Sequence, residues 1–339
     1  MADPAAASPP DAILVVAPAR VSELVMAQSL FKALRAHSPT CAIDVLAPAW
    51  GLPLLARMPE VREGIAMPSG LAGAWRLGRA LRGRYRQAIV LPAAWQSAVV
   101  PFAAGIRRRT GWRGQLRVGL LNDIRRPDKT HQTTQVQRFV MLGAAPTAQA
   151  PAVEPPRFDV KVTDVQSAMQ LLKVQKTAQR KVLALCPGAD FGPARQWPTV
   201  HYAELGRQLA REGWDIWLFG SDKDRAITDG VAATCKVVTN LVGRTTLAQA
   251  VDLMSLADAV VSNDSGLMHI AAALDRPLVA LYGSTDPRIR PPLNARHQVV
   301  SLGLSCSPCN RPECPLGTTA CLVDMPVERV AEALRAVLG

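Results

Sequence analysis

Residues 258–287 contain the pattern that most narrowly limits the fold of this chain. Residues 259–262 form a short apolar run that ends in a polar turn. Apolar residues then recur at helical spacing, at Leu267, Ile270, Ala271 and Leu274. Asp275-Arg276-Pro277 is expected to stop this helix before a second apolar run at 278–281. A strand, a turn, a helix and a second strand form a βαβ unit, so the sequence predicts a parallel sheet whose ligands bind at the carboxyl ends of its strands.

The turn Asn263-Asp264-Ser265-Gly266 is the first candidate binding site. Ser265 and Gly266 offer unpaired backbone N–H groups at the positive end of a helix dipole, which suits a diphosphate, and Gly266 lets a ligand approach the backbone. We expect His269 to lie off the apolar face and to lean back toward the same ligand. The alternative is ordinary helix capping by Asp-Ser-Gly, with a solvent-facing histidine.

The alternation of strands and helices extends along the whole chain. In the first half it predicts strands at 12–17, 42–46 and 87–91, and helices from Glu23, over the arginine-bearing stretch 71–86 and near 132–142. In the second half it predicts strands at 181–186, 214–219 and 236–239, and helices near 200–212, 223–234 and 246–256. Residues 1–10 read as a leader, and the Ala/Pro-rich segment 143–156 as a linker. The prediction is an α/β protein with two Rossmann-like doubly wound domains, residues 1–160 and 161–339, that face a central ligand cleft.

Three further loops of the second domain are expected to converge with 263–266 at one end of the sheet. Loop 186–198 is rich in Gly and Pro and carries Arg195, a forked partner for a phosphate. The other two are Phe219-Gly-Ser-Asp222 and Gly243-Arg-Thr-Thr246. Their convergence favours a nucleotide site. The chain has no G-x-G-x-x-G after its first strand and no Walker loop, which disfavours nicotinamide binding and ATP hydrolysis.

Positive charge is concentrated in the first half of the chain. Residues 1–160 hold 20 Lys and Arg against 10 Asp and Glu, a net +10, whereas residues 161–339 hold 19 against 17, a net +2. The excess suits nucleic acid, an acidic membrane surface or a phosphorylated substrate, or is simply a solvated basic face. An aromatic content of 5%, with no aromatics interleaved among the arginines, disfavours nucleic acid. These arginines are Arg76, Arg79, Arg82, Arg84, Arg86, Arg107, Arg108, Arg109, Arg113, Arg117, Arg125 and Arg126.

The seven cysteines fall into two groups. Three lie in apolar strands or at helix ends and are expected to be core thiols, namely Cys41, Cys186 and Cys235. The other four lie in a Pro-rich loop with the spacing Cys306-x2-Cys309-x4-Cys314-x6-Cys321. Four thiols in one loop suit a structural zinc. The alternative is free thiols or a labile disulfide, because a cytosolic compartment disfavours stable bridges.

No run of the sequence approaches the roughly 20 apolar residues of a membrane span. The first residues, Met-Ala-Asp-Pro-Ala-Ala-Ala-Ser-Pro-Pro, lack the basic and apolar regions of a signal peptide. We therefore expect a cytoplasmic protein.

Several segments together resemble a known family. They are Ile43–Trp50, Arg57–Val61, Thr110–Asp123, Cys186–Arg195 and Asn263–His269. From about residue 12 to the C-terminus the chain resembles the bacterial ADP-heptose:lipopolysaccharide heptosyltransferases of glycosyltransferase family 9, and their type II members most. The resemblance implies a GT-B fold, with an acceptor-binding N-terminal domain and a donor-binding C-terminal domain. It also implies inverting transfer of L-glycero-D-manno-heptose from ADP-heptose to heptose I on the Kdo-lipid A inner core, with no cofactor and no obligatory metal.

The resemblance also assigns site residues. Its Asp-[ST]-Gly-x-x-His loop maps onto Asp264, Ser265, Gly266 and His269, and its basic residue near the diphosphate maps onto Arg195. With Asp222, these are the predicted donor-binding residues. Arg113 and Arg117 are the predicted acceptor-binding residues, and they suit Kdo carboxylates and lipid A phosphates.

Glu23 is the predicted catalytic base. The family usually carries Gly-Asp after the first strand, whereas this chain has Ser22-Glu23. Two alternatives stay open: a related family member that moves another nucleotide-activated sugar or uses another acceptor, and a nucleotide-sugar-binding protein that has lost turnover. Contact with the inner membrane is a further expectation.

Overall fold

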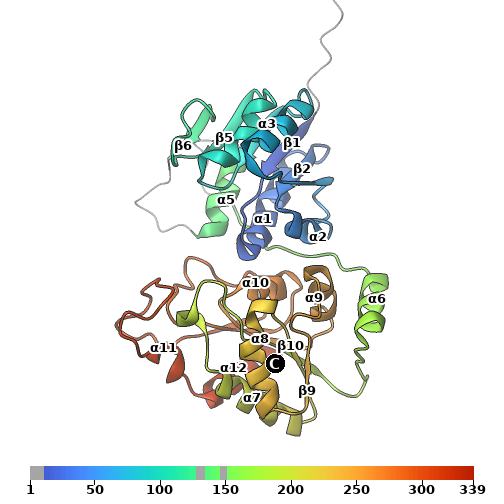
Figure 1. The fold of residues 1–339 in the computed structure, drawn as a ribbon, viewed down its shortest axis with the longest axis vertical. Helices are drawn as coiled ribbons and strands as arrows, with labels where there is room; N and C mark the ends of the chain where they lie inside the picture. Colours follow the sequence, from blue (N-terminus) through green and yellow to red (C-terminus); the bar gives the residue numbers. More distant parts are fainter. Residues whose placement is uncertain (1–10, 127–133, 146–150) are drawn as a thin grey trace, which may run out of the picture. The chain divides into compact units, whose positions relative to one another are not determined.

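The structure is a computed structural model that describes residues 11–126, 134–145 and 151–339. The chain divides into two compact units, Met1–Glu154 and Pro155–Gly339 (Figure 1). The division falls inside the segment 143–156 that was expected to be a linker, a few residues before the predicted domain limit at residue 160. The leader 1–10 lies outside the described residues, as do residues 146–150 of the linker and the stretch 127–133.

The first unit contains one parallel sheet of six strands in the order β3-β2-β1-β4-β5-β6. This is the 3-2-1-4-5-6 order of a Rossmann fold. Its central strands are buried apolar runs, as expected for strands covered on both faces. The strands are β1 (Ala12–Val16), β2 (Ala42–Ala47), β3 (Glu63–Ala66), β4 (Gln87–Val90), β5 (Arg108–Trp112) and β6 (Asp123–Arg125).

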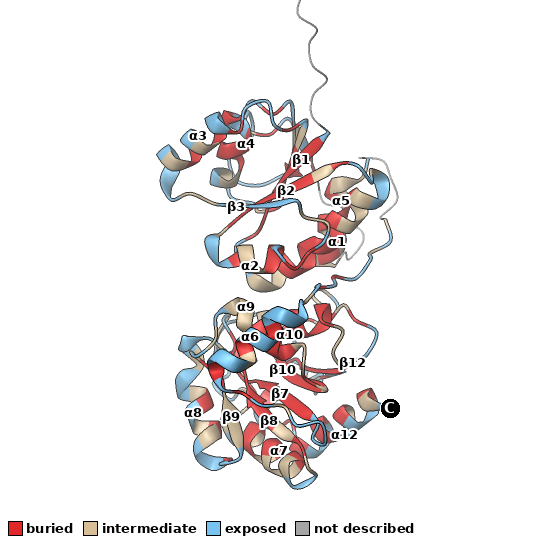
Figure 2. Cartoon of the chain, turned by 90° about the vertical axis from the view of Figure 1, so that its right-hand side faces the viewer, coloured by how far each residue is buried: buried red, intermediate tan, exposed pale blue. Residues whose placement is uncertain are grey.

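Helices cover both faces of this sheet (Figure 2). α1 (Val21–His37) packs against α5 (Gln135–Gly143), and α3 (Gly70–Ala80) packs against α4 (Val99–Ala103). The face with α3 and α4 buries the alternate β1 residues Ala12, Leu14 and Val16. Short helical segments complete the unit: η1 (Ala49–Gly51), α2 (Leu52–Leu55) and η2 (Trp95–Ala98).

The second unit repeats the same topology. Its six parallel strands lie in the order β12-β11-β10-β7-β8-β9, so that β7 and β10 are neighbours at the centre. Val261 of β10 is in register with Leu185 of β7 and Val279 of β11. The strands are β7 (Val182–Cys186), β8 (Asp215–Leu218), β9 (Val238–Asn240), β10 (Ala259–Asn263), β11 (Leu278–Leu281) and β12 (His297–Val300).

Helices again cover both faces. The core around α7, α8 and α12 contains Trp197 and Tyr202, whose rings meet edge to face with centroids 4.9 Å apart. The other face carries α6, α9 and α10 (Figure 2). The helices are η3 (Pro193–Arg195), α6 (Val162–Leu172), α7 (Thr199–Arg211), η4 (Asp222–Asp224), α8 (Arg225–Thr234), α9 (Leu247–Met254), α10 (Gly266–Ala273), α11 (Ala320–Val323) and α12 (Val327–Leu338).

The doubly wound α/β prediction is confirmed in each unit, with limited corrections to the elements. The first helix begins at Val21 rather than Glu23, and the predicted helix 71–86 ends at Ala80. Strands β3, β5, β6 and β12 were not predicted. Within the described residues, no helix is long and apolar enough to cross a membrane.

The prediction of a single buried face on α10 is wrong. Met268 is fully buried and His269 is only 2% exposed, whereas Leu267 is half-buried. The reason is that α10 is covered by the sheet on one side and contacted by α9 on another. Its C-terminal stop is as predicted, because Asp275 takes a left-handed φ of 53° just after the helix.

Candidate active site

Asn263 connects the two central strands of the second sheet at the point where the strand order reverses. Its side-chain Oδ1 accepts hydrogen bonds from the backbone N–H of Trp197 (3.1 Å) and from the Tyr202 hydroxyl (3.0 Å). Its Nδ2 donates to the carbonyl oxygen of Pro187 at 2.7 Å. All of these groups are buried. Asn263 therefore ties both ends of loop 187–197 to the end of β10, at the switch point where ligands of such sheets bind.

Asp264, the next residue, organises the charge at this point. Its Oδ2 lies 2.9 Å from Nη1 of Arg195 and accepts a hydrogen bond from the Thr285 hydroxyl at 2.7 Å. The side chains of Arg195 and Asp264 are 11% and 5% exposed. The Arg195 guanidinium also stacks on Phe191, 4.0 Å from the ring centroid. A buried ion pair held by an additional hydrogen bond presents a cation in a defined place, as a diphosphate site requires.

His269 lies among the same charges and is only 2% exposed, so the solvent-facing alternative is wrong. Its pKa is lowered to about 4, mainly by burial; the nearby Asp264 carboxylate acts in the opposite direction, and the Arg290 and Arg195 cations add to the decrease. The imidazole is therefore neutral at physiological pH. Its buried Nε2 has no hydrogen-bond partner among the described residues. An unpartnered buried nitrogen beside a cationic cluster is consistent with a place for a ligand atom.

The start of α10 also fits the predicted anion site. Ser265 occupies the N-cap position with an extended backbone, but its side chain makes no capping hydrogen bond. Its hydroxyl lies 3.3 Å from that of Ser262 instead. The capping alternative is thus correct in placing Ser265 at the N-cap position, but wrong in expecting its side chain to make a capping hydrogen bond. The backbone N–H groups at Gly266 keep their role as candidate donors to a diphosphate.

Asp222 occupies the exposed start of η4 after β8. Its carboxylate accepts a hydrogen bond from Nε of Arg225 at 3.0 Å, and Arg225 also donates to the carbonyl oxygen of Gly243 at 3.2 Å. Loops 219–222 and 243–246 thus meet, as predicted. The side chain of Asp222 is 77% exposed and already ion-paired, in contrast to the buried pair of Arg195 and Asp264.

In the first unit, Glu23 lies in the first turn of α1, which follows β1. Its side chain is partly exposed, so the carboxylate is within reach of solvent at the carboxyl end of a central strand. A negative charge in the first turn of a helix interacts favourably with the helix dipole. Glu23 therefore combines a negative charge with the place expected of a base at the switch point of its sheet.

The two predicted acceptor-binding arginines differ in their surroundings. Arg113 is exposed, whereas Arg117 is only 1% exposed, so its assignment to the basic surface is wrong. Nη1 of Arg117 donates to the carbonyl oxygen of Pro92 in the loop after β4. Its Nε and Nη2 have no partner among the described residues, and burial lowers its pKa. A buried guanidinium with unused donors is a candidate for binding an anionic group.

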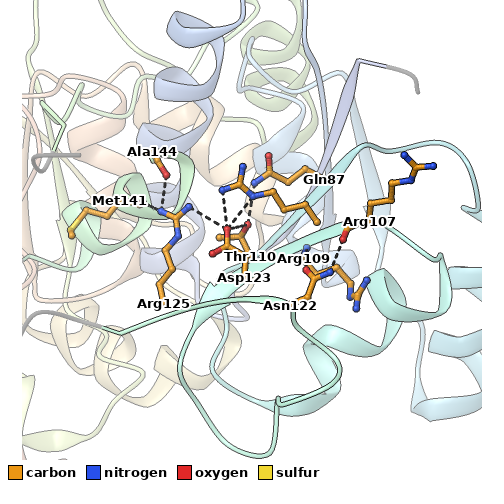
Figure 3. Close-up of polar contacts among 10 residues, drawn as sticks. Gln87, Arg107, Arg109, Thr110, Asn122, Asp123, Arg125, Met141 and Ala144 are labelled. Atoms are coloured by element: carbon orange, nitrogen blue, oxygen red, sulfur yellow. Dashed lines mark hydrogen bonds and ion pairs between the residues drawn. The ribbon is translucent and has the colours of Figure 1, made fainter. Parts of the chain in front are cut away.

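Other arginines of the basic half stabilise the edge of the first sheet (Figure 3). Asp123 accepts hydrogen bonds from Arg108 (2.9 Å) and Thr110 (2.9 Å), while Arg125 donates to the carbonyl oxygens of Met141 (2.6 Å) and Ala144 (2.7 Å). Burial alone would raise the pKa of Asp123, but the hydrogen bonds outweigh it and lower that pKa. Arg125 is 9% exposed, so its place on the predicted surface is wrong too.

Two residues of the second site were not among the predicted donor-binding residues. Thr285, 6% exposed, binds the carboxylate of Asp264, and Asn263 connects the loops. A signal for Thr285 exists in the sequence: Gly283-Ser-Thr-Asp286 follows β11, the strand next to β10. Polar residues that follow adjacent parallel strands meet at one edge of a sheet.

Comparison with known proteins shows which family the chain is similar to. Residues 74–320 match glycosyltransferase family 9 (heptosyltransferase). The chain is 42% identical over 348 residues to lipopolysaccharide heptosyltransferase 2 of Salmonella typhimurium, which covers 96% of this chain and 98% of the relative. It is 43% identical over 344 residues to the protein of the same name from Escherichia coli, with the same coverage.

A solved structure gives the same result at the level of the fold. The structure of E. coli ADP-heptose lipopolysaccharide heptosyltransferase II matches with a TM-score of 0.86 and 41% identity, over 96% of this chain and 98% of the other. The heptosyltransferases of this family have the GT-B fold, which agrees with the two Rossmann-ordered sheets found here. Because the matches extend over nearly the whole chain, it belongs to glycosyltransferase family 9, the heptosyltransferases.

Proposed function

We propose that the protein is an inverting glycosyltransferase that transfers L-glycero-D-manno-heptose from ADP-heptose to heptose I of the lipopolysaccharide inner core. The observation that carries the proposal is the identity of 42% to a lipopolysaccharide heptosyltransferase 2 over nearly the full length of both chains. One of the segments that carry the resemblance, Asn263–His269, also makes buried polar contacts in the second unit. Asn263 and Asp264 make these contacts.

The second unit is the proposed donor domain. ADP leaves the anomeric carbon as an anion, and its diphosphate is held by the start of α10 and by the Arg195 guanidinium. Asp264 and Thr285 keep that guanidinium in one orientation. The neutral imidazole of His269 offers a hydrogen bond without adding a charge. Asp222 is proposed to contact the donor at the edge of the site. It can do so only if its carboxylate leaves its ion pair with Arg225.

The first unit is the proposed acceptor domain, with Glu23 as the general base. Its carboxylate removes the proton from the acceptor heptose hydroxyl as that oxygen attacks the anomeric carbon, which inverts the configuration. Arg117, together with the exposed Arg113, is proposed to bind carboxylate or phosphate groups of the acceptor. The reaction is proposed to take place in the cytoplasm, with peripheral contact between the basic unit and the inner membrane.

A donor screen with purified protein tests the proposal. Heptose-deficient lipopolysaccharide that ends in heptose I is incubated separately with ADP-heptose and with a UDP-sugar, and each product is weighed by mass spectrometry. The proposal predicts addition of one heptose from ADP-heptose alone. Consumption of a UDP-sugar with ADP-heptose left intact would establish the alternative family member, and binding of ADP-heptose without turnover would establish the binding protein.

A further inference from the structure

The four cysteines of the C-terminal loop share one small cavity. Cys306, Cys309, Cys314 and Cys321 all line it, beside Ala194 and Ser284. Its free volume is about 20 Å³. A cavity needs roughly 10–15 Å³ to hold a water molecule, so this space has room for about one small ion.

The loop that carries these thiols has little else to hold it together. Residues 301–319 contain no helix or strand, and none of their side chains is fully buried. Structureless loops longer than about 12–15 residues are uncommon in compact domains, and segments without an apolar core are usually held by metals or disulfides. No disulfide is present, because all four cysteines are free.

The backbone of the loop nevertheless takes defined turns around its cysteines. Asn310, directly after Cys309, has a left-handed φ of 55°, and Gly317, three residues after Cys314, has a φ of 70°. The Sγ of Cys314 accepts a hydrogen bond from the backbone N–H of Thr319 at 3.3 Å. The backbone of the loop is therefore ordered around its cysteines, although residues 301–319 contain no helix or strand.

Cys321 lies close enough to the other three sulfurs to interact with each of them. Four sulfurs gathered around one cavity can coordinate a single cation together.

We infer that Cys306, Cys309, Cys314 and Cys321 bind one thiophilic transition-metal ion, zinc or iron, in a tetrahedral site. Among the described residues no group of three ligands is already arranged for a metal, so binding requires the four side chains to turn into their shared cavity. Tetrahedral sites of four sulfurs select these metals. The inference does not rest on the proposed function.

The metal site would also support loop 187–197, which carries Arg195. The backbone N–H of Ala194 donates to the carbonyl oxygen of Pro312 at 3.1 Å, and the N–H of Asn310 donates to that of Ser284 at 2.6 Å. A Cβ on Gly192 would lie 2.4 Å from the same Pro312 oxygen. The cysteine loop therefore packs directly on the segment that precedes Arg195. A metal in it would fix that segment from outside the substrate site.

Elemental analysis of the full-length protein tests the inference. Protein from cells grown with added zinc is dialysed and analysed for zinc and iron, and we expect close to one ion per chain. Cys306→Ser/Cys309→Ser should lose it, whereas Cys235→Ala, a core thiol, should keep it. Circular dichroism shows whether the double variant is folded.

A measurement on the unmodified chain keeps the test independent of folding. Cobalt added to protein that has been stripped of metal should give the intense absorption of thiolate-bound tetrahedral cobalt, and bound zinc should slow the reaction of the loop thiols with a disulfide reagent at least ~10-fold. Absence of zinc and iron from the purified protein, no such cobalt absorption and equal thiol reactivity with and without zinc would overturn the inference.

Discussion

The two units share one strand order but differ in how their switch points are built. In the second unit, Asn263 and Asp264 link the ends of β7, β10 and β11 through buried hydrogen bonds and an ion pair. In the first unit, Arg117 reaches the loop after β4 with one nitrogen and leaves two others unused among the described residues. The contrast shows that one strand order can carry both a switch point cross-linked by buried polar contacts and one whose buried guanidinium keeps unused donors among the described residues. In the proposed function, the first kind of site binds ADP and the second binds the acceptor.

The largest effect is expected from Glu23→Gln. The amide keeps the size of the side chain but cannot accept the proton, so kcat should fall by about 10²-fold or more. Steady-state kinetics with ADP-heptose and a heptose I acceptor measure this. Glu63→Gln, which removes an exposed carboxylate paired with Arg84 in the same unit, is the matched control and should leave kcat unchanged. Near-normal turnover by Glu23→Gln would place the base elsewhere.

Asn263→Ala should destabilise the second unit. The change leaves the Trp197 N–H and the Tyr202 hydroxyl without the Asn263 acceptor. Each such buried group costs about 1–3 kcal/mol, so we expect a loss of about 2–6 kcal/mol in the free energy of unfolding. Urea unfolding measures it. Asn240, which ends β9 as Asn263 ends β10, is partly exposed, and its replacement by Ala should lower stability much less. Equal losses of unfolding free energy in the two variants would show that Asn263 does not stabilise the unit more than Asn240 does.

His269 should make stability depend on pH. Its pKa is about 4 in the folded protein, against 6.5 for an unperturbed histidine. Between these values the unfolded chain binds a proton that the folded protein does not. The free energy of unfolding therefore decreases as pH falls from about 6.5 to about 4, by up to about 3 kcal/mol. Subtracting the pH profile of His269→Gln from that of the wild type should isolate this decrease, and parallel profiles would contradict it.

Arg117→Lys should weaken binding of the acceptor and leave binding of the donor unchanged. Lysine keeps the charge but loses the fork that binds carboxylate or phosphate groups, so the KM for lipopolysaccharide should rise about 10-fold while ADP affinity stays constant. Arg79→Lys, on the exposed end of α3, is the control. If the KM for the acceptor is unchanged and only stability falls, Arg117 is a structural residue of the first unit.

The sequence predicted the central strands and the meeting of the loops because these depend on local apolar runs and on parallel pairing. It missed β3, β5, β6 and β12; of these, β3 and β6 form the edges of the first sheet and β12 forms an edge of the second. Edge strands pair on one side and need no continuous apolar run, and β3 (Glu-Gly-Ile-Ala) is largely exposed.

The errors at single residues have a different cause. His269 was expected off the apolar face because helical spacing describes one face, whereas α10 is packed on more than one side and His269 is buried. Arg117 was counted among surface charges because a run of arginines does not show that this side chain packs closely against two neighbouring glycines. A Cβ on Gly111 would lie 2.6 Å from its Nη2, and one on Gly114 would lie 3.3 Å from its Cδ. No local pattern of charge contains that information.

The second unit is proposed to bind the donor and the first unit the acceptor. The affinity for ADP tests this assignment most directly. Calorimetric titration of ADP is carried out on the wild type, Arg195→Ala and Glu23→Gln, all as full-length protein. Arg195→Ala should lose about 1.5–3 kcal/mol of binding free energy, the range for a hydrogen bond to a charged group, and Glu23→Gln should bind as the wild type does. Unchanged affinity in Arg195→Ala together with weakened binding in Glu23→Gln would contradict the account.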